Sequence, residues 1–209
     1  IQPARGVIRL GGQILSAAAV AFGFTRFRFP AREPLFFLVL STMMLPWQVT
    51  IVPQFLLFRY LGWLNTFLPL IVPSFFGGGA FFIFLLRQFF MTIPRDLDEA
   101  AKLDGASSVR IFWSIILALS GPAIATVAIF SFLQHWNEFI GPLIFLNTED
   151  KYTLSIGLRY FMANPFESDE PREAILMAAS LIVALPPLIL FFVAQKYFVR
   201  GIVTTGLKG

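Results

Sequence analysis

The stretch YLGWLNTFLPLIVPSFFGGGAFFIFLL, residues 60–86, contains 27 residues without a single Asp, Glu, Lys or Arg. A helix rises about 1.5 Å per residue, so about 20 apolar residues cross the ~30 Å hydrocarbon core of a bilayer. This stretch therefore predicts a membrane-spanning helix. Gly77, Gly78 and Gly79 interrupt it, and we expect a local break or close packing against a neighbouring helix there. A hinge or a gap lining a pore is the alternative.

Four more uncharged runs follow the same pattern. They cover residues 10–25, 34–58, 111–137 and 174–195. The last three are as long as a bilayer requires, and the first becomes long enough if Arg9 snorkels to the headgroups. We therefore expect an all-α fold: a polytopic membrane helix bundle with five crossings, forming a single transmembrane domain over residues 7–200.

The composition excludes several classes of function. The chain is 57% hydrophobic and 13% charged, about half the charged content of a soluble domain. It has no Cys and a single His, His135, so disulfides, thiolate metal sites and two-His zinc motifs are excluded. It also lacks the Gly-Lys pair of a phosphate-binding loop. We expect contact with membrane lipid but no metal, cofactor or nucleic acid, and any ATP that drives the protein must bind another chain.

The basic residues predict an orientation. Segments 26–33 and 87–110 and the tail after residue 195 hold ten basic and five acidic residues, whereas the remaining segments hold six basic and seven acidic residues. Lys and Arg accumulate in cytoplasmic loops. We therefore expect these three segments and the C-terminus in the cytoplasm and the first residues outside, which also predicts a further crossing before Ile1.

The segment PRDLDEAAKLDGASSVR, residues 94–110, holds seven of the 28 charged residues. One charge at the bilayer centre costs about 2.5–3.5 kcal/mol, so this segment must lie outside the membrane. Asp96 followed by Glu99 predicts a capped helix start at Asp96. Asp98 and Lys102 are four residues apart, and we expect them to pair on one helix face.

Two features of this segment suit contact with another protein. Ala100 and Ala101 form a small-residue face, and the nearby acids can accept hydrogen bonds from a partner's Arg or Lys. Gly105 permits a turn at positive φ, and we expect a second helix to begin at Ser107 or Ser108. An ordinary solvated connector is the alternative interpretation.

Glu99-Ala100-Ala101, with Gly105 four residues on and Ile115 and Leu117 beyond, resembles the EAA motif of ABC-importer permeases. Other blocks, in the same order along the chain, resemble the carbohydrate-uptake branch of these permeases, the MalG-like class. They include RFRFPARE (26–33), LLRQFF (85–90), DEAAKLDGAS (98–107), WNEF (136–139), TLSIGL (153–158) and QKYFVRG (195–201). The resemblance covers nearly the whole chain, from about residue 12 onward.

The resemblance implies one half of a heterodimeric channel in a bacterial inner membrane. A second permease would complete the channel, and an extracytoplasmic solute-binding protein would deliver a sugar, polyol or glycerol phosphate. Cytoplasmic ATPase subunits would hydrolyse ATP, so the chain itself would not be an enzyme. They would grip a coupling helix at 96–106 within the cytoplasmic segment 94–110. The roles implied by the motif are a polar ATPase contact for Glu99, close approach for Ala100 and Ala101, and a bend at Asp104 and Gly105.

The chain departs from the family pattern in two ways. Ala118 follows Leu117 where the family has proline. We therefore expect a straighter helix after the coupling segment, with a later kink at Pro122. Complete members have six crossings, and we expect the first of these to precede Ile1.

Trp136 and Asn137 lie at the outer end of the fourth expected crossing and are candidates for a solute path or gate. A tryptophan at this depth also serves as an interface anchor. We expect His135 to be hydrogen-bonded at the helix end and Arg87 to snorkel or to lie on the cytoplasmic face. An ion-coupled secondary transporter or channel is the alternative function, but such proteins bury acids within their crossings, and the uncharged runs contain none.

Overall fold

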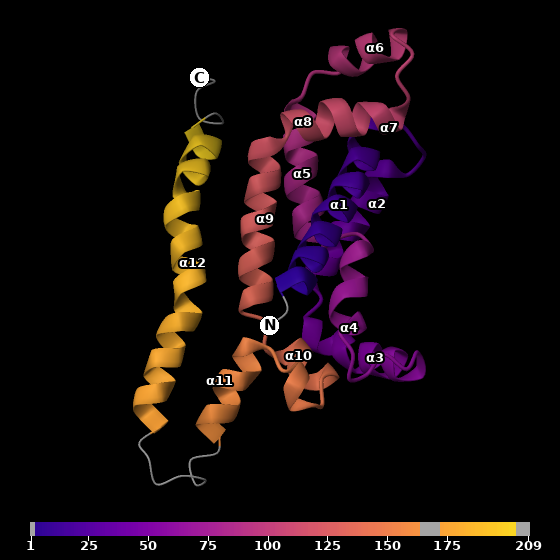
Figure 1. The fold of residues 1–209 in the computed structure, drawn as a ribbon. Helices are drawn as coiled ribbons and strands as arrows, with labels where there is room; N and C mark the ends of the chain where they lie inside the picture. The colour runs from indigo at the N-terminus through magenta and orange to yellow at the C-terminus, as the bar shows by residue number, and fades with distance from the viewer. Residues whose placement is uncertain (1–2, 164–171, 204–209) are drawn as a thin grey trace.

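The computed structural model describes residues 3–163 and 172–203, and the secondary structure within these ranges is helical throughout (Figure 1). The elements in chain order are α1 (Pro3–Arg26), α2 (Arg32–Ser41), η1 (Thr42–Met44), α3 (Trp47–Tyr60), α4 (Leu68–Ile71), η2 (Val72–Phe75), α5 (Ala80–Thr92), α6 (Asp96–Leu103), α7 (Ser108–Ile111), η3 (Phe112–Ile116), α8 (Leu117–Leu119), α9 (Gly121–Trp136), α10 (Ile140–Phe145), η4 (Glu149–Lys151), α11 (Leu154–Ala163) and α12 (Arg172–Val203).

The described residues contain three helices that are long and apolar enough to cross a membrane, namely Arg5–Arg26, Leu68–Thr92 and Ala174–Ala194. Two further pairs qualify only as bent spans: Arg32–Met44 with Trp47–Tyr60, and Ser108–Leu119 with Gly121–Trp136. The all-α membrane bundle is therefore confirmed. Five crossings are reached only if each bent pair counts as one.

The expected crossing over residues 34–58 is not a straight helix. The chain turns by 96° between η1 and α3, and α3 lies across one end of the bundle (Figure 1). Leu45, at ψ 118°, and Pro46, at ψ 130°, are extended. The ring of Pro46 disfavours helical conformation at the preceding residue, so the helix stops before it.

The later kink predicted at Pro122 is confirmed, and Ala118, which stands in place of the family's proline, lies inside the helical stretch Ser108–Leu119 that precedes it. The chain bends by 80° between Ser108–Leu119 and Gly121–Trp136. Pro122 stands in the first turn of α9, and its ring blocks the helical bond to the carbonyl four residues earlier. The elements from α7 to α8 consequently lie across the end of the bundle and do not continue α9 (Figure 1).

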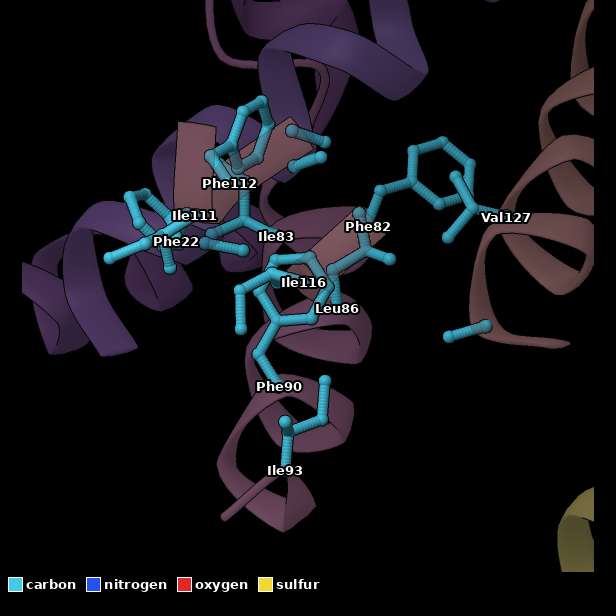
Figure 2. Close-up of a cluster of buried hydrophobic side chains, with 14 of the residues drawn as sticks. Phe22, Phe82, Ile83, Leu86, Phe90, Ile93, Ile111, Phe112, Ile116 and Val127 are labelled. Carbon is cyan, nitrogen blue, oxygen red and sulfur yellow. The ribbon is translucent and has the colours of Figure 1, made fainter. Parts of the chain in front are cut away.

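The main core joins α1, α5 and the α7–α8 region. Three alanines of α1, Ala17, Ala18 and Ala21, are fully buried and let this helix approach closely. Figure 2 shows the large side chains that fill the remaining space, among them Phe90 and Ile116, both fully buried. Lipid tails are as apolar as these side chains, so close van der Waals packing holds the helices together.

The span Leu68–Thr92 is broken at its glycines, and polar side chains of other helices bind the freed carbonyls. The amide nitrogen Nε2 of Gln13 donates to the carbonyl of Gly78 at 3.0 Å, and Ser131 Oγ donates to Gln13 Oε1. Ser16 Oγ donates to the carbonyl of Ser74 at 2.8 Å. Bilayer hydrocarbon offers no such partners, so a broken helix needs its neighbours to supply them. Both the predicted break and the predicted close packing are confirmed.

α12 stands beside the bundle and packs on α9 and α11 (Figure 1). The most apolar window of this helix has no residue buried inside the described part of the chain. Leu181, Ile189 and Phe192 are each more than half exposed. This helix therefore presents an apolar surface to whatever surrounds it.

We predict that Gly78→Ala lowers the melting temperature in detergent more than Gly77→Ala does. Both glycines have positive φ, 64° and 89°, so alanine costs roughly 1–2 kcal/mol at either position. A Cβ at Gly78 would also meet the Gln13 backbone oxygen and, at 2.7 Å, the Ala17 Cβ, whereas one at Gly77 would meet no described atom within 4 Å. Overpacking adds about 1–3 kcal/mol. Equal melting temperatures would contradict the close contact.

Candidate functional site

The charged segment forms a short helix, α6, that stands away from the bundle at one end of the molecule (Figure 1). Its acids lie in the first turn and Lys102 in the last, as the helix dipole favours. The predicted cap at Asp96 is wrong, because Arg95 occupies the N-cap position and its carbonyl accepts the amides of Asp98 and Glu99.

A buried ion pair fastens α6 to the end of α1. Arg26 Nε lies 2.9 Å from Asp98 Oδ2, and the two side chains are 6% and 9% exposed. Arg26 also donates to the carbonyl of Ile93 at 3.1 Å, and Arg95 donates to the carbonyl of Thr25 at 3.0 Å. The predicted pairing of Asp98 with Lys102 is therefore wrong: Asp98 turns inward, toward an arginine 72 positions earlier in the chain.

The bend after α6 has the geometry of a Schellman cap. Gly105 has φ 78°, and its amide bonds the carbonyl of Lys102 at 3.0 Å. The amide of Ala106 bonds the carbonyl of Ala101 at 2.8 Å, which completes the two-bond pattern. The predicted turn at Gly105, which follows Asp104, is confirmed. α7 then begins at Ser108, one of the two predicted starts, with Ser107 as its cap.

The two alanines of the motif face different surroundings. Ala100 is exposed, as are Glu99, Asp104 and Gly105, whereas Ala101 is half-buried and packs against the main core. Leu103, which is 90% exposed, belongs to the same helix and was not among the predicted site residues. Leu103 could have been found from the sequence, because a large aliphatic side chain in a short charged helix outside the membrane is not covered by lipid.

α6 is connected mechanically to two membrane helices. The ion pair to Arg26 joins it to α1, and the segment α7–α8 joins it to α9. Within that segment, Ile111, Phe112 and Ile116 are buried in the main core, where Phe112 packs 5.1 Å from the ring of Phe22 (Figure 2). Packed side chains, and not only a connecting loop, therefore join α6 to the core.

The opposite end of the molecule contains a cavity of about 460 Å³ between the start of α1, the end of α9 and residues 150–155. Trp136 lines this cavity. The side chain of Asn137 is exposed, and its amide nitrogen donates to the carbonyl of Leu133 in the preceding helix at 3.0 Å. The two solute-path candidates are therefore not equivalent in position. Only Trp136 lines the cavity.

Trp136 also binds α12. Its indole Nε1 donates to the carbonyl of Val183 at 3.1 Å. In an uninterrupted helix this carbonyl would accept the amide of residue 187, but Pro187 has no amide hydrogen. The indole thus replaces the donor that proline removes, as membrane helices require.

The contacts that charged and polar side chains make around the cavity differ from those predicted. Arg9 was expected to snorkel to the headgroups, but its Nη1 lies 2.6 Å from Glu138 Oε2, with both side chains largely covered. His135 lines the cavity, and neither of its ring nitrogens has a hydrogen-bond partner among the described residues. The expectation of a hydrogen-bonded helix-end histidine is therefore wrong.

Arg87 does not snorkel, because its side chain is buried and paired. It is 8% exposed inside α5, its Nη2 lies 3.0 Å from Glu33 Oε2, and its guanidinium stacks 4.0 Å from the centre of the Phe36 ring. The pairing explains how a charge can lie within the span Leu68–Thr92.

Asn65 is a positioning residue that the sequence analysis did not identify. It has φ 55°, a conformation that asparagine tolerates better than most residues. Its Oδ1 accepts the amide of Asn147 at 3.1 Å and the hydroxyl of Thr148 at 3.0 Å, and its carbonyl accepts Lys151 Nζ at 2.9 Å. These bonds hold the wall of the cavity against the loop before α4.

A model of the family described as "Binding-protein-dependent transport system inner membrane component" matches residues 13–204. The chain belongs to this family. The permease is 35% identical over 190 residues to the sn-glycerol-3-phosphate transport system permease protein UgpE of Yersinia pestis, covering 91% of this chain and 65% of the relative. It is 35% identical over 196 residues to the arabinooligosaccharides transport system permease protein AraQ of Halalkalibacterium halodurans, covering 94% and 68%.

A solved structure supports the same assignment. The permease matches a chain from the crystal structure of a bacterial ABC transporter involved in the import of the acidic polysaccharide alginate, with a TM-score of 0.76 and 26% identity over 93% of this chain and 73% of that one. The permease spans about two thirds of the length of the curated relatives. These findings confirm the resemblance and do not favour an ion-coupled transporter or channel.

We predict that Asp98→Asn lowers the free energy of unfolding by roughly 3–5 kcal/mol, because it leaves the Arg26 charge buried without its partner. Glu99→Gln is the matched control, since this side chain is exposed, and it should change stability by less than about 0.5 kcal/mol. Replacing both members of the pair, with Arg26→Met and Asp98→Leu, should recover most of the loss. Detergent unfolding curves measure all three, and equal effects of Asp98→Asn and Glu99→Gln would contradict the buried pair.

We predict that Trp136→Phe weakens the contact between α9 and α12 by about 1 kcal/mol through loss of the indole donor. In a Pro187→Ala background the Val183 carbonyl regains an intrahelical donor, so the same Trp136→Phe change should cost less. A double-mutant cycle on unfolding free energies measures the difference. Additive effects would show that the indole does not replace the donor missing at Pro187.

Proposed function

We propose that this chain is the permease subunit of an ATP-driven importer that passes a sugar or a related solute, such as a polyol or glycerol phosphate, inward across the membrane. The observation that carries the proposal is α6: a charged helix outside the membrane, with an exposed outer face, fastened to α1 and continuous with α9. The named relatives, which include transporters of arabinooligosaccharides and sn-glycerol-3-phosphate, support this class of solute.

Separate ATPase subunits drive the cycle by binding the exposed face of α6. Glu99 supplies a carboxylate for a partner's Arg or Lys, and Ala100 lets the partner approach the backbone. Leu103 adds an apolar contact at the end of the same face. Asp104 and Gly105 keep the bend fixed, so movement of α6 redirects the helices behind it. Alternating access then follows from the difference in ATPase binding between two states.

The end that bears α6 faces the cytoplasm, and so does the C-terminus. The last turns of α12 lie at the same end of the molecule as α6 (Figure 1). Arg26, Arg28, Arg32 and Arg95 cluster at that end, in agreement with the excess of basic residues on cytoplasmic loops.

Two further partners complete the assembly. A second permease subunit packs against the open apolar surface of α12, forming a heterodimer around the solute path. An extracytoplasmic solute-binding protein docks at the opposite end, where the 460 Å³ cavity lies. Trp136 is the residue of this chain best placed to contact a passing solute. Glu167, Asp169 and Glu170 lie outside the described residues.

We predict that Glu99→Ala and Gly105→Pro reduce co-purification of the ATPase and abolish solute uptake. The first removes an exposed carboxylate from α6, and the second is incompatible with φ 78°. Glu149→Ala, an exposed acid at the other end of the molecule, is the control and should leave the ATPase bound. Full complex formation and uptake in both α6 variants would overturn the assignment of the coupling helix.

A further inference from the structure

An open hollow of about 600 Å³ lies beside the start of α6, between the α1–α2 loop and Arg95. Arg28, Arg32 and Arg95 line it, and Glu33 is the acid among its lining residues. Three guanidinium groups facing one carboxylate give the hollow a positive charge. The coupling mechanism proposed above assigns no role to this hollow.

The carboxylate is already shared between two arginines. Glu33 Oε1 accepts Nε and Nη2 of Arg32 at 3.1 and 2.8 Å, and both of its oxygens accept Nη2 of Arg87 at 3.0 Å. Arg95 donates to the neutral carbonyl of Thr25 and forms no ion pair with any residue that the structure describes. Arg28 has no ion pair or side-chain hydrogen bond with any residue in the described ranges. The hollow therefore attracts an anion.

The surface next to the hollow is apolar. Phe27 and Phe29 in the loop are 46% and 37% exposed, and α2, which begins at the hollow, exposes Phe37 and Leu38 at 65% and 62%. Aromatic rings and arginines together mark the depth of lipid headgroups, with acyl chains directly below. An acidic protein segment would match the charges but not the exposed apolar side chains that continue into the membrane span.

We propose that this hollow binds the phosphate of an anionic phospholipid, with Arg28 and Arg32 as its principal contacts and the exposed face of α2 against the acyl chains. Which leaflet supplies the lipid depends on the orientation proposed above, whereas the chemistry of binding does not depend on it. Arg95 is both a wall of the hollow and the N-cap of α6. A bound phosphate at this point would steady the start of the coupling helix.

The test is a titration of the purified transporter with phosphatidylglycerol, in detergent or in phosphatidylcholine nanodiscs, with bound lipid counted by native mass spectrometry. Each arginine near a membrane surface contributes enough to change affinity about fivefold, so Arg28→Gln should weaken binding about fivefold and Arg28→Gln with Arg32→Gln roughly 30-fold. Arg28→Gln alone removes no ion pair or hydrogen bond within the described residues, so weaker lipid binding by this variant cannot be attributed to unfolding. Arg28→Lys should retain most of the affinity.

Arg59→Gln is the matched control, because Arg59 is an exposed arginine at the end of α3, away from the hollow. Unchanged phosphatidylglycerol affinity in the double variant, or an equal loss in the control, would overturn the proposal. Inorganic phosphate that competes as well as the lipid would identify a site for a soluble anion instead. Loss of ATPase co-purification at unchanged lipid affinity would identify the hollow as a protein contact. Either result would also overturn it, while leaving the proposed transport function standing.

Discussion

The ion pair between Arg26 and Asp98 is the constraint on which the position of α6 depends. It joins the last residue of the first membrane span to a helix that lies outside the membrane, and both side chains are almost completely covered. Removing two charges from water is costly, and an apolar pair would often be as stable. The contribution of the pair is geometric. A guanidinium and a carboxylate at 2.9 Å fix both the distance of α6 from the end of α1 and its orientation.

A second constraint comes from the bilayer. This chain breaks its membrane helices with prolines and glycines, and each break leaves a carbonyl that lipid cannot satisfy. Gln13 supplies the donor at Gly78, Ser16 supplies it at Ser74, and Trp136 supplies it at Val183. The donors come from α1 and α9, which are also the helices connected to α6. α6 is thus connected to the same helices that supply these donors.

These two constraints separate the molecule into ends with different tasks. One end has α6, the buried ion pair that fastens it to α1, and the arginine-lined hollow beside the α1–α2 loop. The other end has the cavity, whose walls are held by Asn65 and whose edge includes Trp136. Between them lies the main core, packed around α1 and α5 (Figure 2). Closely packed interiors have few intermediate arrangements, so the two ends are expected to change state together.

Much of this was predictable because it depends on local chemistry. Uncharged runs long enough for a bilayer identified the membrane class, and the order of the sequence blocks identified the permease family. Gly105 identified the turn, since positive φ excludes most other residues. The local pairing rule failed at Asp98 because a residue distant in the chain had intervened. The expected partner of Asp98 was four positions away, and the actual partner, Arg26, is 72 positions away.

The sequence by itself therefore determined that the chain is a membrane protein and that Gly105 bends the backbone, and it predicts that residues 94–110 lie outside the membrane, because charge and backbone sterics act locally. The tertiary structure alone decided which way Asp98 points, that Ala101 faces inward while Ala100 faces outward, and that α3 and the α7–α8 segment lie across the ends of the bundle. Those outcomes depend on which helices lie against one another. Burial and pairing are properties of the packed bundle and of no single segment.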